Sequence, residues 1–344
     1  MRTLLNTLYV MTPQSYVHLE NSTVRIDVDH EKKLAVPLHH LGAIVCFGNI
    51  MVSPALMHRL ADEGKSLVLL NDHGRFKARL EGPVSGNILL RQAHHARAID
   101  PAAALEIARA CVAGKIRNCR LVLRRGARDC KQAEEEAAIS TVADELSACL
   151  RRAAVATDAD QLRGIEGDAA KRYFSALPLL VRPDQRAAFT MDGRTRRPPL
   201  DRFNALISFL YAMLMNDCRS AVEAVGLDAQ LGFLHAVRPG RAALALDLME
   251  EFRPLFADRL ALSLINRLQV AEKDFGIRPG GAVNLSDEAR KTVVVAYQER
   301  KQDELSHPLL EQNVPVALLP LLQARLMART VRGEMDCYLP FLAS

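Results

Sequence analysis

The chain has 344 residues, of which 49% are hydrophobic, 25% charged and 5% aromatic, and its formal net charge is +5. This composition excludes a disordered or low-complexity protein, and the length is sufficient for two domains. The modest positive charge permits an anionic partner without requiring one. No stretch approaches the ~18 apolar residues of a membrane span. The seven cysteines form no CxxC pair, so we expect a reduced, cytoplasmic protein.

The first eighty residues have the patterns of β-strands. Apolar or alternating runs occupy residues 4–10, 16–20, 24–28, 43–47, 66–70 and 75–80. The second and third runs are separated by Asn21 and Ser22, which predicts a hairpin. Ser53 and Pro54 are suitable residues to open a helix, and Gly64 is a suitable residue to end it.

From about residue 87 the apolar residues recur with the helical period of 3.6. The pattern predicts helices over residues 87–97, 102–126, 131–152, 158–177, 200–225, 241–271, 286–304 and 315–331. We therefore expect an α+β protein in which a small β domain precedes a large helical domain, with the boundary near residues 82–90.

Two acids stand in the apolar segment that is predicted to form the 241–271 helix. Asp247 and Glu250 are three residues apart, so a helix places both carboxylates on one face. His235 lies shortly before this segment. Because buried acids are costly unless they are paired or bound to a metal, these two indicate a nearby cation.

A third acid, Glu166, lies between Gly164 and Gly167 in a predicted helix. Each glycine costs a helix about 1 kcal/mol relative to alanine, so glycines are expected there if a ligand or another backbone approaches closely. Glu166, His235 and Glu250 would together offer oxygen and nitrogen ligands for Mg²⁺ or Mn²⁺, and the nitrogen favours Mn²⁺. The alternative is that Glu166 is a surface residue, His235 a loop cap, and Glu250 part of a solvated helix end.

Two groups of arginines could bind an anion. One group falls on one face of the predicted 102–126 helix and its end, and comprises Arg117, Arg120, Arg124 and Arg128. It is either a ridge that follows phosphates or a solvated helix face. The other group lies in a loop, where its charges are displayed rather than paired, and comprises Arg194, Arg196 and Arg197. For this loop we favour anion binding.

Several segments together resemble a known family. They are Gly232-Phe233-Leu234-His235, Gly164-Ile165-Glu166-Gly167, Arg196-Arg197-Pro198-Pro199 and the segment Leu246-Asp247-Leu248-Met249-Glu250-Glu251-Phe252-Arg253-Pro254. Their order and spacing resemble those of the CRISPR-associated adaptation integrases (the Cas-one family), the metal-dependent DNA endonucleases of spacer acquisition. The segments after residue 296 look closest to the form found with type I-C systems.

The resemblance implies an N-terminal β-sandwich-like domain over residues 1–84 that dimerises, and an all-α nuclease and integrase domain over residues 85–344. It assigns Mn²⁺ or Mg²⁺ to Glu166, His235 and Glu250, with Asp247 in a supporting catalytic role. Many relatives carry Asp where this chain has Glu250, so the chain departs from the common pattern at that ligand.

The resemblance also implies a reaction and partners. The 3′-hydroxyl ends of short DNA duplexes would be joined to the CRISPR repeat, and the arginines would hold the DNA backbone. The partners would be double-stranded DNA, a second copy of the chain and the small adaptation partner protein (Cas-two). Two other classes stay open from the residues alone: a non-enzymatic scaffold that binds nucleic acid, and a metal-dependent phosphohydrolase of small phosphate esters.

Overall fold

The computed structural model of the protein describes residues 6–71, 76–80, 82 and 88–343. It divides into two compact units, residues 1–85 and 86–344. The sequence pattern predicted a boundary near residues 82–90, and the resemblance implied one between residues 84 and 85. The roles expected for the two parts, dimerisation and catalysis, stay predictions.

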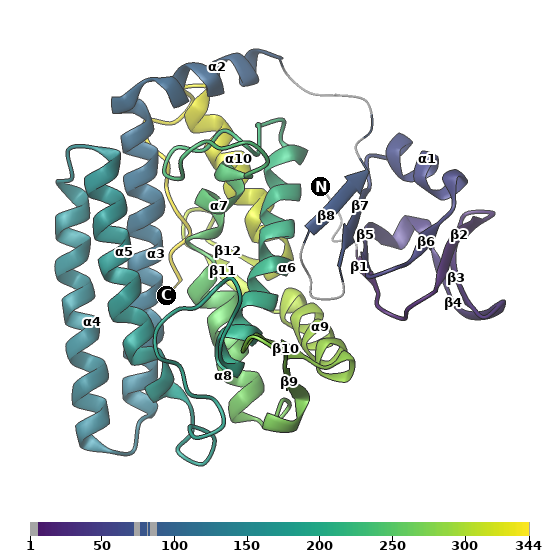
Figure 1. Ribbon diagram of the computed structural model, residues 1–344. Coiled ribbons are helices and arrows are strands. Elements are labelled where there is room, and N and C mark those ends of the chain that lie inside the picture. Colours follow the sequence, from purple (N-terminus) through teal and green to yellow (C-terminus); the bar gives the residue numbers. More distant parts are fainter. Residues whose placement is uncertain (1–5, 72–75, 81, 83–87, 344) are drawn as a thin grey trace. The chain divides into compact units, whose positions relative to one another are not determined.

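The first unit contains two four-stranded sheets (Figure 1). In one sheet the strand order is β1 (Asn6–Val10), β5 (Leu41–Phe47), β7 (Ser66–Leu70) and β8 (Phe76–Leu80). The first three of these strands are parallel, and β8 is antiparallel to β7. In the other sheet the order is β4 (Glu31–Pro37), β3 (Thr23–Val28), β2 (Tyr16–Glu20) and β6 (Met51–Val52). The predicted hairpin at Asn21 and Ser22 joins β2 to β3.

One hydrophobic core holds this unit together. Helix α1 (Pro54–Asp62) follows Ser53, whose side chain accepts a hydrogen bond from Leu56 N, as the cap and proline signal predicted. Leu56 and Leu60 of α1 are fully buried in a core with Val17 and Ile44, which come from different sheets. The two sheets therefore share a core, as in a sandwich.

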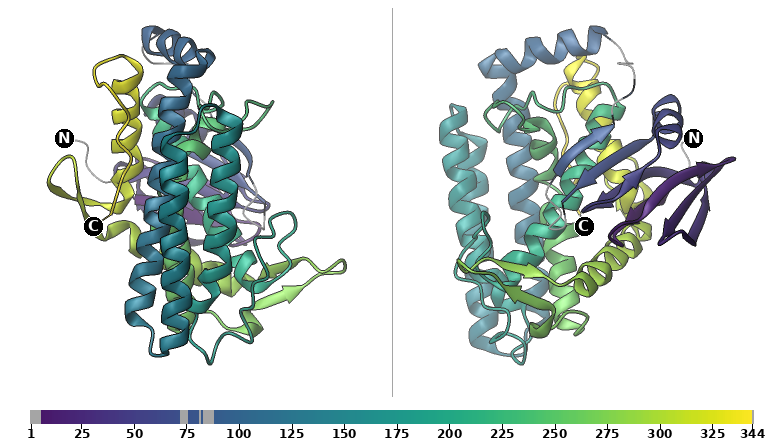
Figure 2. Two further views of the ribbon diagram at one scale, coloured as in Figure 1. Left: turned by 90° about the vertical axis from the view of Figure 1, so that its left-hand side faces the viewer. Right: turned by 45° about the vertical axis from the view of Figure 1, so that its right-hand side comes forward.

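The second unit is mainly helical (Figures 1 and 2). Three long helices, α3 (Pro101–Asp129), α4 (Ala133–Ala154) and α5 (Ala159–Ala176), lie side by side. Helix α6 (Arg202–Ala224) packs against α7 (Ala243–Met249) and α10 (Leu319–Val331). The remaining α-helices of the described chain are α2 (Ile88–Ile99), α8 (Arg259–Asn266) and α9 (Asp287–Gln302). Among the described residues, no helix is both long and apolar enough to cross a membrane.

The predicted helix 241–271 is wrong as one continuous element. It consists of α7, a wider π-helical stretch over Arg253–Asp258, and α8. Pro254 cannot donate a backbone hydrogen bond, so the regular α-helical ladder cannot continue through it. Stretches of π-helix are frequent at functional sites, and this one begins three residues after Glu250.

The second unit also contains short strands that the helical pattern did not predict. Strands β9 (Phe275–Ile277) and β10 (Val283–Leu285) form one antiparallel pair, and β11 (Glu304–His307) and β12 (Gln312–Pro315) form another. Strands of three or four residues are too short to show a period of two clearly. The predicted α+β class is confirmed, with a mainly helical rather than all-α second unit.

Candidate metal centre

Asp247 on α7 organises the loop that carries His235. Its side chain is fully buried. One oxygen, Oδ2, accepts hydrogen bonds from the backbone amides of Phe233 at 2.6 Å and Leu234 at 3.0 Å. The other, Oδ1, accepts from the backbone N of His235 at 3.0 Å and lies 2.6 Å from His235 Nδ1. One carboxylate thus fixes both the loop and the imidazole ring.

Close packing explains the glycine at the start of this loop. A Cβ atom at Gly232 would lie 2.8 Å from Asp247 Oδ2 and 2.8 Å from the carbonyl carbon of Ala243. The buried His94 also contacts this loop, because its Nε2 lies 2.9 Å from the carbonyl oxygen of Leu231. Burial lowers the pKa of His94 to about 4, so its ring is neutral here.

The imidazole of His235 faces Glu250. The Asp247 carboxylate can only accept a hydrogen bond, so His235 Nδ1 must donate it. This assigns the ring proton to Nδ1 and leaves the lone pair on Nε2. His235 Nε2 lies 3.8 Å from Glu250 Oε1. Metal-binding histidines are commonly oriented in this way by a carboxylate on the other ring nitrogen. The prediction that Asp247 and Glu250 share one face is confirmed.

Lys115 on α3 joins Glu250 to the third predicted ligand. Its ammonium lies 2.6 Å from Glu250 Oε2 and forms an ion pair with Glu166 Oε1 on α5. Burial alone would lower the pKa of Lys115, but the charges of Glu250 and Glu166 outweigh it and raise the pKa. Side chains that are far apart in sequence thus meet at one place.

Arg253 supplies a second cation to Glu250, and its Nη2 lies 3.1 Å from Glu250 Oε1. Burial alone would raise the pKa of Glu250, but Arg253 and Lys115 outweigh it and hold the pKa well below its ordinary value. Glu250 and Glu251 are only 2% and 1% exposed. The alternative prediction of a solvated helix end is therefore wrong.

The donor set suits a divalent cation. Two carboxylates and an imidazole nitrogen match the preferences of Mn²⁺ and Mg²⁺, with the nitrogen favouring Mn²⁺. The side chains of Glu166 and His235 are 23% and 20% exposed, whereas that of Glu250 is 3% exposed, so the set is accessible from one side. Among the described residues, no three acid, histidine or cysteine side chains already stand in metal-binding positions. Here a lysine ammonium lies between the two acids.

The glycines beside Glu166 do not serve close protein packing. In the part of the chain that the structure describes, no other atom lies within 4 Å of a Cβ built at Gly164 or Gly167, apart from their own helix and neighbours. No other described backbone segment of this chain therefore approaches them closely. The approach of a ligand stays a prediction.

The structure separates the predicted arginines into exposed and internal ones. On α3, Arg117 and Arg128 are exposed, whereas Arg120 and Arg124 are half-buried, and Arg124 forms an ion pair with Asp144 of α4. In the loop before α6, Arg196 and Arg197 are exposed.

Arg194 turns inward. Its guanidinium donates to Asn204 Oδ1 at 2.8 Å and to Ser208 Oγ at 2.9 Å, and it lies 5.3 Å from the ring centre of Tyr211. The exposed arginines are thus better placed to meet a phosphate backbone.

A second group of buried side chains holds the C-terminal segment near Glu251. Glu251 Oε1 accepts a hydrogen bond from Tyr338 Oη at 2.7 Å, and Glu251 Oε2 accepts one from Phe341 N at 2.5 Å. Gln323 lies 3.4 Å from Glu251 Oε2. Burial raises the pKa of Glu251 to about 8 even though these groups donate to it.

Sequence reasoning missed Lys115 and Arg253. A signal for Lys115 was present, because it shares a helical face with the buried Cys111, Cys119 and Val122 rather than with the arginines. A lysine on an apolar helical face indicates a buried partner. The identity of that partner could not be predicted, since Glu166 and Glu250 lie 51 and 135 residues further along the chain.

The fold and pocket define a two-part α+β protein with a candidate divalent-cation site on its helical unit. The sequence profile of the family described as CRISPR associated protein Cas1 matches residues 8–299. A relative from Moorella thermoacetica, named CRISPR-associated endonuclease Cas1 1, is 53% identical over 99% of both chains. The chain belongs to the CRISPR-associated Cas1 family.

Solved structures show the same fold. A CAS1 protein from Thermotoga maritima superposes with a TM-score of 0.82 at 23% identity, covering 98% of this chain and 100% of that one. A chain of a Cas6-RT-Cas1–Cas2 complex superposes with a TM-score of 0.83 at 22% identity, covering 100% of this chain and 37% of that one. The fold of this protein is therefore that of Cas1 proteins along its length.

Proposed function

We propose that this chain is the metal-dependent endonuclease and integrase of CRISPR spacer acquisition, which joins the 3′-hydroxyl ends of short DNA duplexes to the repeat. Membership of the Cas1 family supports the endonuclease and integrase activity. The observation that supports the metal dependence is that Lys115 pairs with both Glu166 and Glu250, while His235, held by Asp247, faces Glu250.

The reaction requires negative charge on a phosphodiester to be stabilised while a hydroxyl attacks it. A Mn²⁺ or Mg²⁺ ion held by Glu166, His235 and Glu250 would supply that stabilisation as a Lewis acid. Asp247 keeps the proton of His235 on Nδ1, so Nε2 is free to donate its lone pair. Arg253 and Lys115 keep Glu250 ionised, which is the form that binds a cation.

The DNA would approach the accessible side of the pocket, where Glu166 and His235 are partly exposed. Exposed arginines on α3 and in the loop before α6 would bind its phosphates and give affinity with little base specificity. They are Arg117, Arg128, Arg196 and Arg197.

The proposal extends to partners. The chain would form a homodimer through its N-terminal unit, and two dimers would be bridged by the small partner Cas2. The Cas6-RT-Cas1–Cas2 complex contains a chain of which a part has the same fold as this protein, which supports the proposal at the level of fold. The resemblance of the segments after residue 296 favours a type I-C system.

An integration assay tests the proposed function. Labelled duplex, target plasmid and the partner protein are incubated with the chain, with and without Mn²⁺. We expect His235→Ala and Glu166→Ala each to abolish strand transfer, and the exposed His95→Ala to leave it intact. Metal-independent transfer, or full activity of the Glu166→Ala variant, would contradict the assignment. Turnover of nucleotides with indifference to long DNA would instead identify a phosphohydrolase.

A further inference from the structure

Lys115 occupies the centre of the proposed metal site. Its side chain is only 7% exposed, and its ammonium lies between Glu166 and Glu250, the two acidic ligands. The rest of the residue is embedded in the apolar face of α3 between Cys111 and Cys119, which are both buried. The lysine therefore cannot satisfy its charge with bulk water and depends on the two carboxylates.

The charges of the two acidic ligands are balanced by two basic side chains without a metal ion. Glu166 and Glu250 contribute two negative charges, and Lys115 and Arg253 contribute two positive charges. Each oxygen of Glu250 faces one of these cations, Oε1 at 3.1 Å from Arg253 and Oε2 at 2.6 Å from Lys115. A divalent ion that binds these carboxylates adds positive charge where the four side chains already balance, and it competes with Lys115 for the same oxygens.

We propose that Lys115 is a built-in cation that a divalent metal ion displaces from Glu166 and Glu250, so that metal binding at this site is an exchange of cations. The inference rests on the metal centre proposed above. Without metal, Lys115 holds together Glu166 of α5 and Glu250, which directly follows α7, and prevents their mutual repulsion. The four-carbon stem of lysine allows its compact charge to move while the helix stays in place.

The exchange makes a prediction that a purely structural ion pair does not make. Removing a competing cation lowers the stability of the metal-free protein and at the same time tightens metal binding. By thermodynamic linkage, the metal and the lysine each weaken the binding of the other to the same extent. A lysine that only supports the fold, or one that helps to hold the metal, would leave metal affinity unchanged or reduce it.

The experiment measures Mn²⁺ binding by isothermal titration calorimetry and the melting temperature of the full chain without metal. Two variants are compared with the wild type: Lys115→Met, which keeps most of the volume, and Lys115→Gln, which keeps a polar group. We expect both to melt at lower temperature without metal and to bind Mn²⁺ more tightly, by on the order of tenfold for Lys115→Met. If Lys115→Met is unfolded without metal, its Mn²⁺-dependent refolding is measured, and refolding is the expected result.

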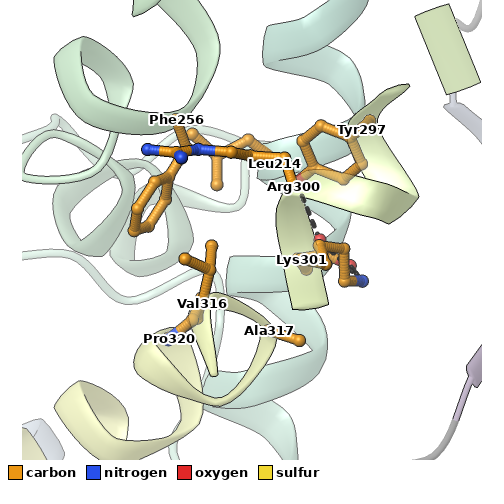
Figure 3. A pocket seen from close by; sticks show the side chains of 9 residues that line it. Leu214, Phe256, Tyr297, Arg300, Lys301, Val316, Ala317 and Pro320 are labelled. Atoms are coloured by element: carbon orange, nitrogen blue, oxygen red, sulfur yellow. Dashed lines mark hydrogen bonds and ion pairs between the residues drawn. The ribbon is translucent and has the colours of Figure 1, made fainter. Parts of the chain in front are cut away.

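A matched control is available at Lys301 on α9. This lysine is also largely buried, at 12% side-chain exposure, and its ammonium lies 3.1 Å from Asp217. Figure 3 shows it at a separate pocket with Tyr297, Arg300 and Val316, which shares no residue with the proposed metal centre. Lys301→Met removes a comparable ion pair and should leave Mn²⁺ affinity unchanged.

The outcomes separate the two proposals. Suppose that the Glu166→Gln substitution abolishes Mn²⁺ binding, but that the Lys115 variants bind Mn²⁺ as weakly as the wild type or more weakly. The exchange is then overturned and the metal centre stands. Failure of Lys115→Met to refold at any Mn²⁺ concentration, together with unchanged affinity of Lys115→Gln, would overturn the exchange in the same way. If Glu166→Gln leaves Mn²⁺ binding unchanged, both the metal centre and the exchange are overturned.

Discussion

Two adjacent glutamates at the end of α7 point into pockets of opposite character. Glu250 faces the cations Lys115 and Arg253 and the imidazole of His235, and we call these residues with Glu166 the front pocket. Glu251 faces the neutral donors of the tail pocket, which are Gln323, the Tyr338 hydroxyl and the Phe341 amide. Both acids are almost fully buried.

Because both acids are buried, the groups that contact each carboxyl, rather than its burial, account for the difference between Glu250 and Glu251. Cations hold the pKa of Glu250 below its ordinary value, whereas burial raises the pKa of Glu251 to about 8 because its partners are neutral. A cation-filled pocket can exchange one cation for another. A pocket of hydroxyl and amide donors can only bind its own segment of chain. We therefore expect the front pocket to take part in the reaction and the tail pocket to stabilise the fold.

The largest expected effect comes from substituting each glutamate in turn. Glu250→Gln should lower Mn²⁺-dependent strand transfer at least about 100-fold, because it removes a charged ligand, and each tenfold corresponds to about 1.4 kcal/mol of transition-state stabilisation. Glu251→Gln should lower the free energy of unfolding by about 1–3 kcal/mol, because the hydroxyl of the protonated carboxyl can still accept a hydrogen bond, whereas the amide NH2 group of glutamine cannot accept one from the donor that it would face. Activity of the folded Glu251→Gln variant should stay near that of the wild type. Equal losses of activity in the two variants would remove the distinction.

A third buried acid, Asp258, extends the comparison. It accepts hydrogen bonds from Tyr211 Oη at 2.8 Å and Tyr173 Oη at 3.0 Å, and burial raises its pKa from 3.8 to about 6 despite these bonds. Its neutral donors resemble those of Glu251. Because the folded protein holds this proton more tightly than the unfolded chain, the stabilisation is fully present below pH 3.8 and is lost as the pH rises through about 6.

Asp258→Asn should abolish this dependence on pH. The free energy of unfolding of the wild type, taken relative to the variant, should fall by on the order of 3 kcal/mol between pH 4 and pH 7. Urea unfolding of both proteins at several pH values measures the difference. A difference that stays constant over this range would show that Asp258 is not held protonated by burial.

A smaller effect distinguishes two glycines near the front pocket. Gly232→Ala would place a methyl group 2.8 Å from Asp247 Oδ2, which must displace the carboxylate that orients His235. We expect Mn²⁺ affinity to fall by about 10–100-fold, as when a group that orients a metal ligand is removed. Gly164→Ala has open space and should raise helix stability by about 1 kcal/mol. Calorimetry with Mn²⁺ on both variants tests this, and an unaffected Gly232→Ala would contradict the role of Asp247.

The smallest effect concerns the surface of α3, where no buried charge is involved. Arg117→Ala and Arg128→Ala each remove an exposed charge, and each ion pair with a DNA phosphate that is removed should reduce the slope of log affinity against log salt by about 0.9. Arg124→Ala should change the slope less, because Arg124 already pairs with Asp144. DNA binding measured at several salt concentrations gives the slopes. Identical slopes in all three variants would mean that the exposed arginines are only solvated.

Local patterns were sufficient to predict much of this molecule. The cap at Ser53, the hairpin at Asn21 and the spacing of Asp247 and Glu250 are all determined within a few residues. The break of the predicted 241–271 helix at Pro254 could also have been predicted from the local sequence. The front pocket could not be predicted in this way, since the placement of Lys115 between Glu166 and Glu250 depends on how α3, α5 and α7 pack. The family resemblance predicted that Glu166, His235 and Glu250 bind one metal ion, but it assigned no role to Lys115.

The most direct test of the metal centre is a crystal of the protein soaked in Mn²⁺ and measured for anomalous scattering from manganese. The account predicts one strong peak within coordination distance of Glu166, His235 Nε2 and Glu250, with the Lys115 ammonium moved away from the position between the two acids. A crystal with manganese bound elsewhere, or with these three side chains free of metal at saturating Mn²⁺, would contradict it.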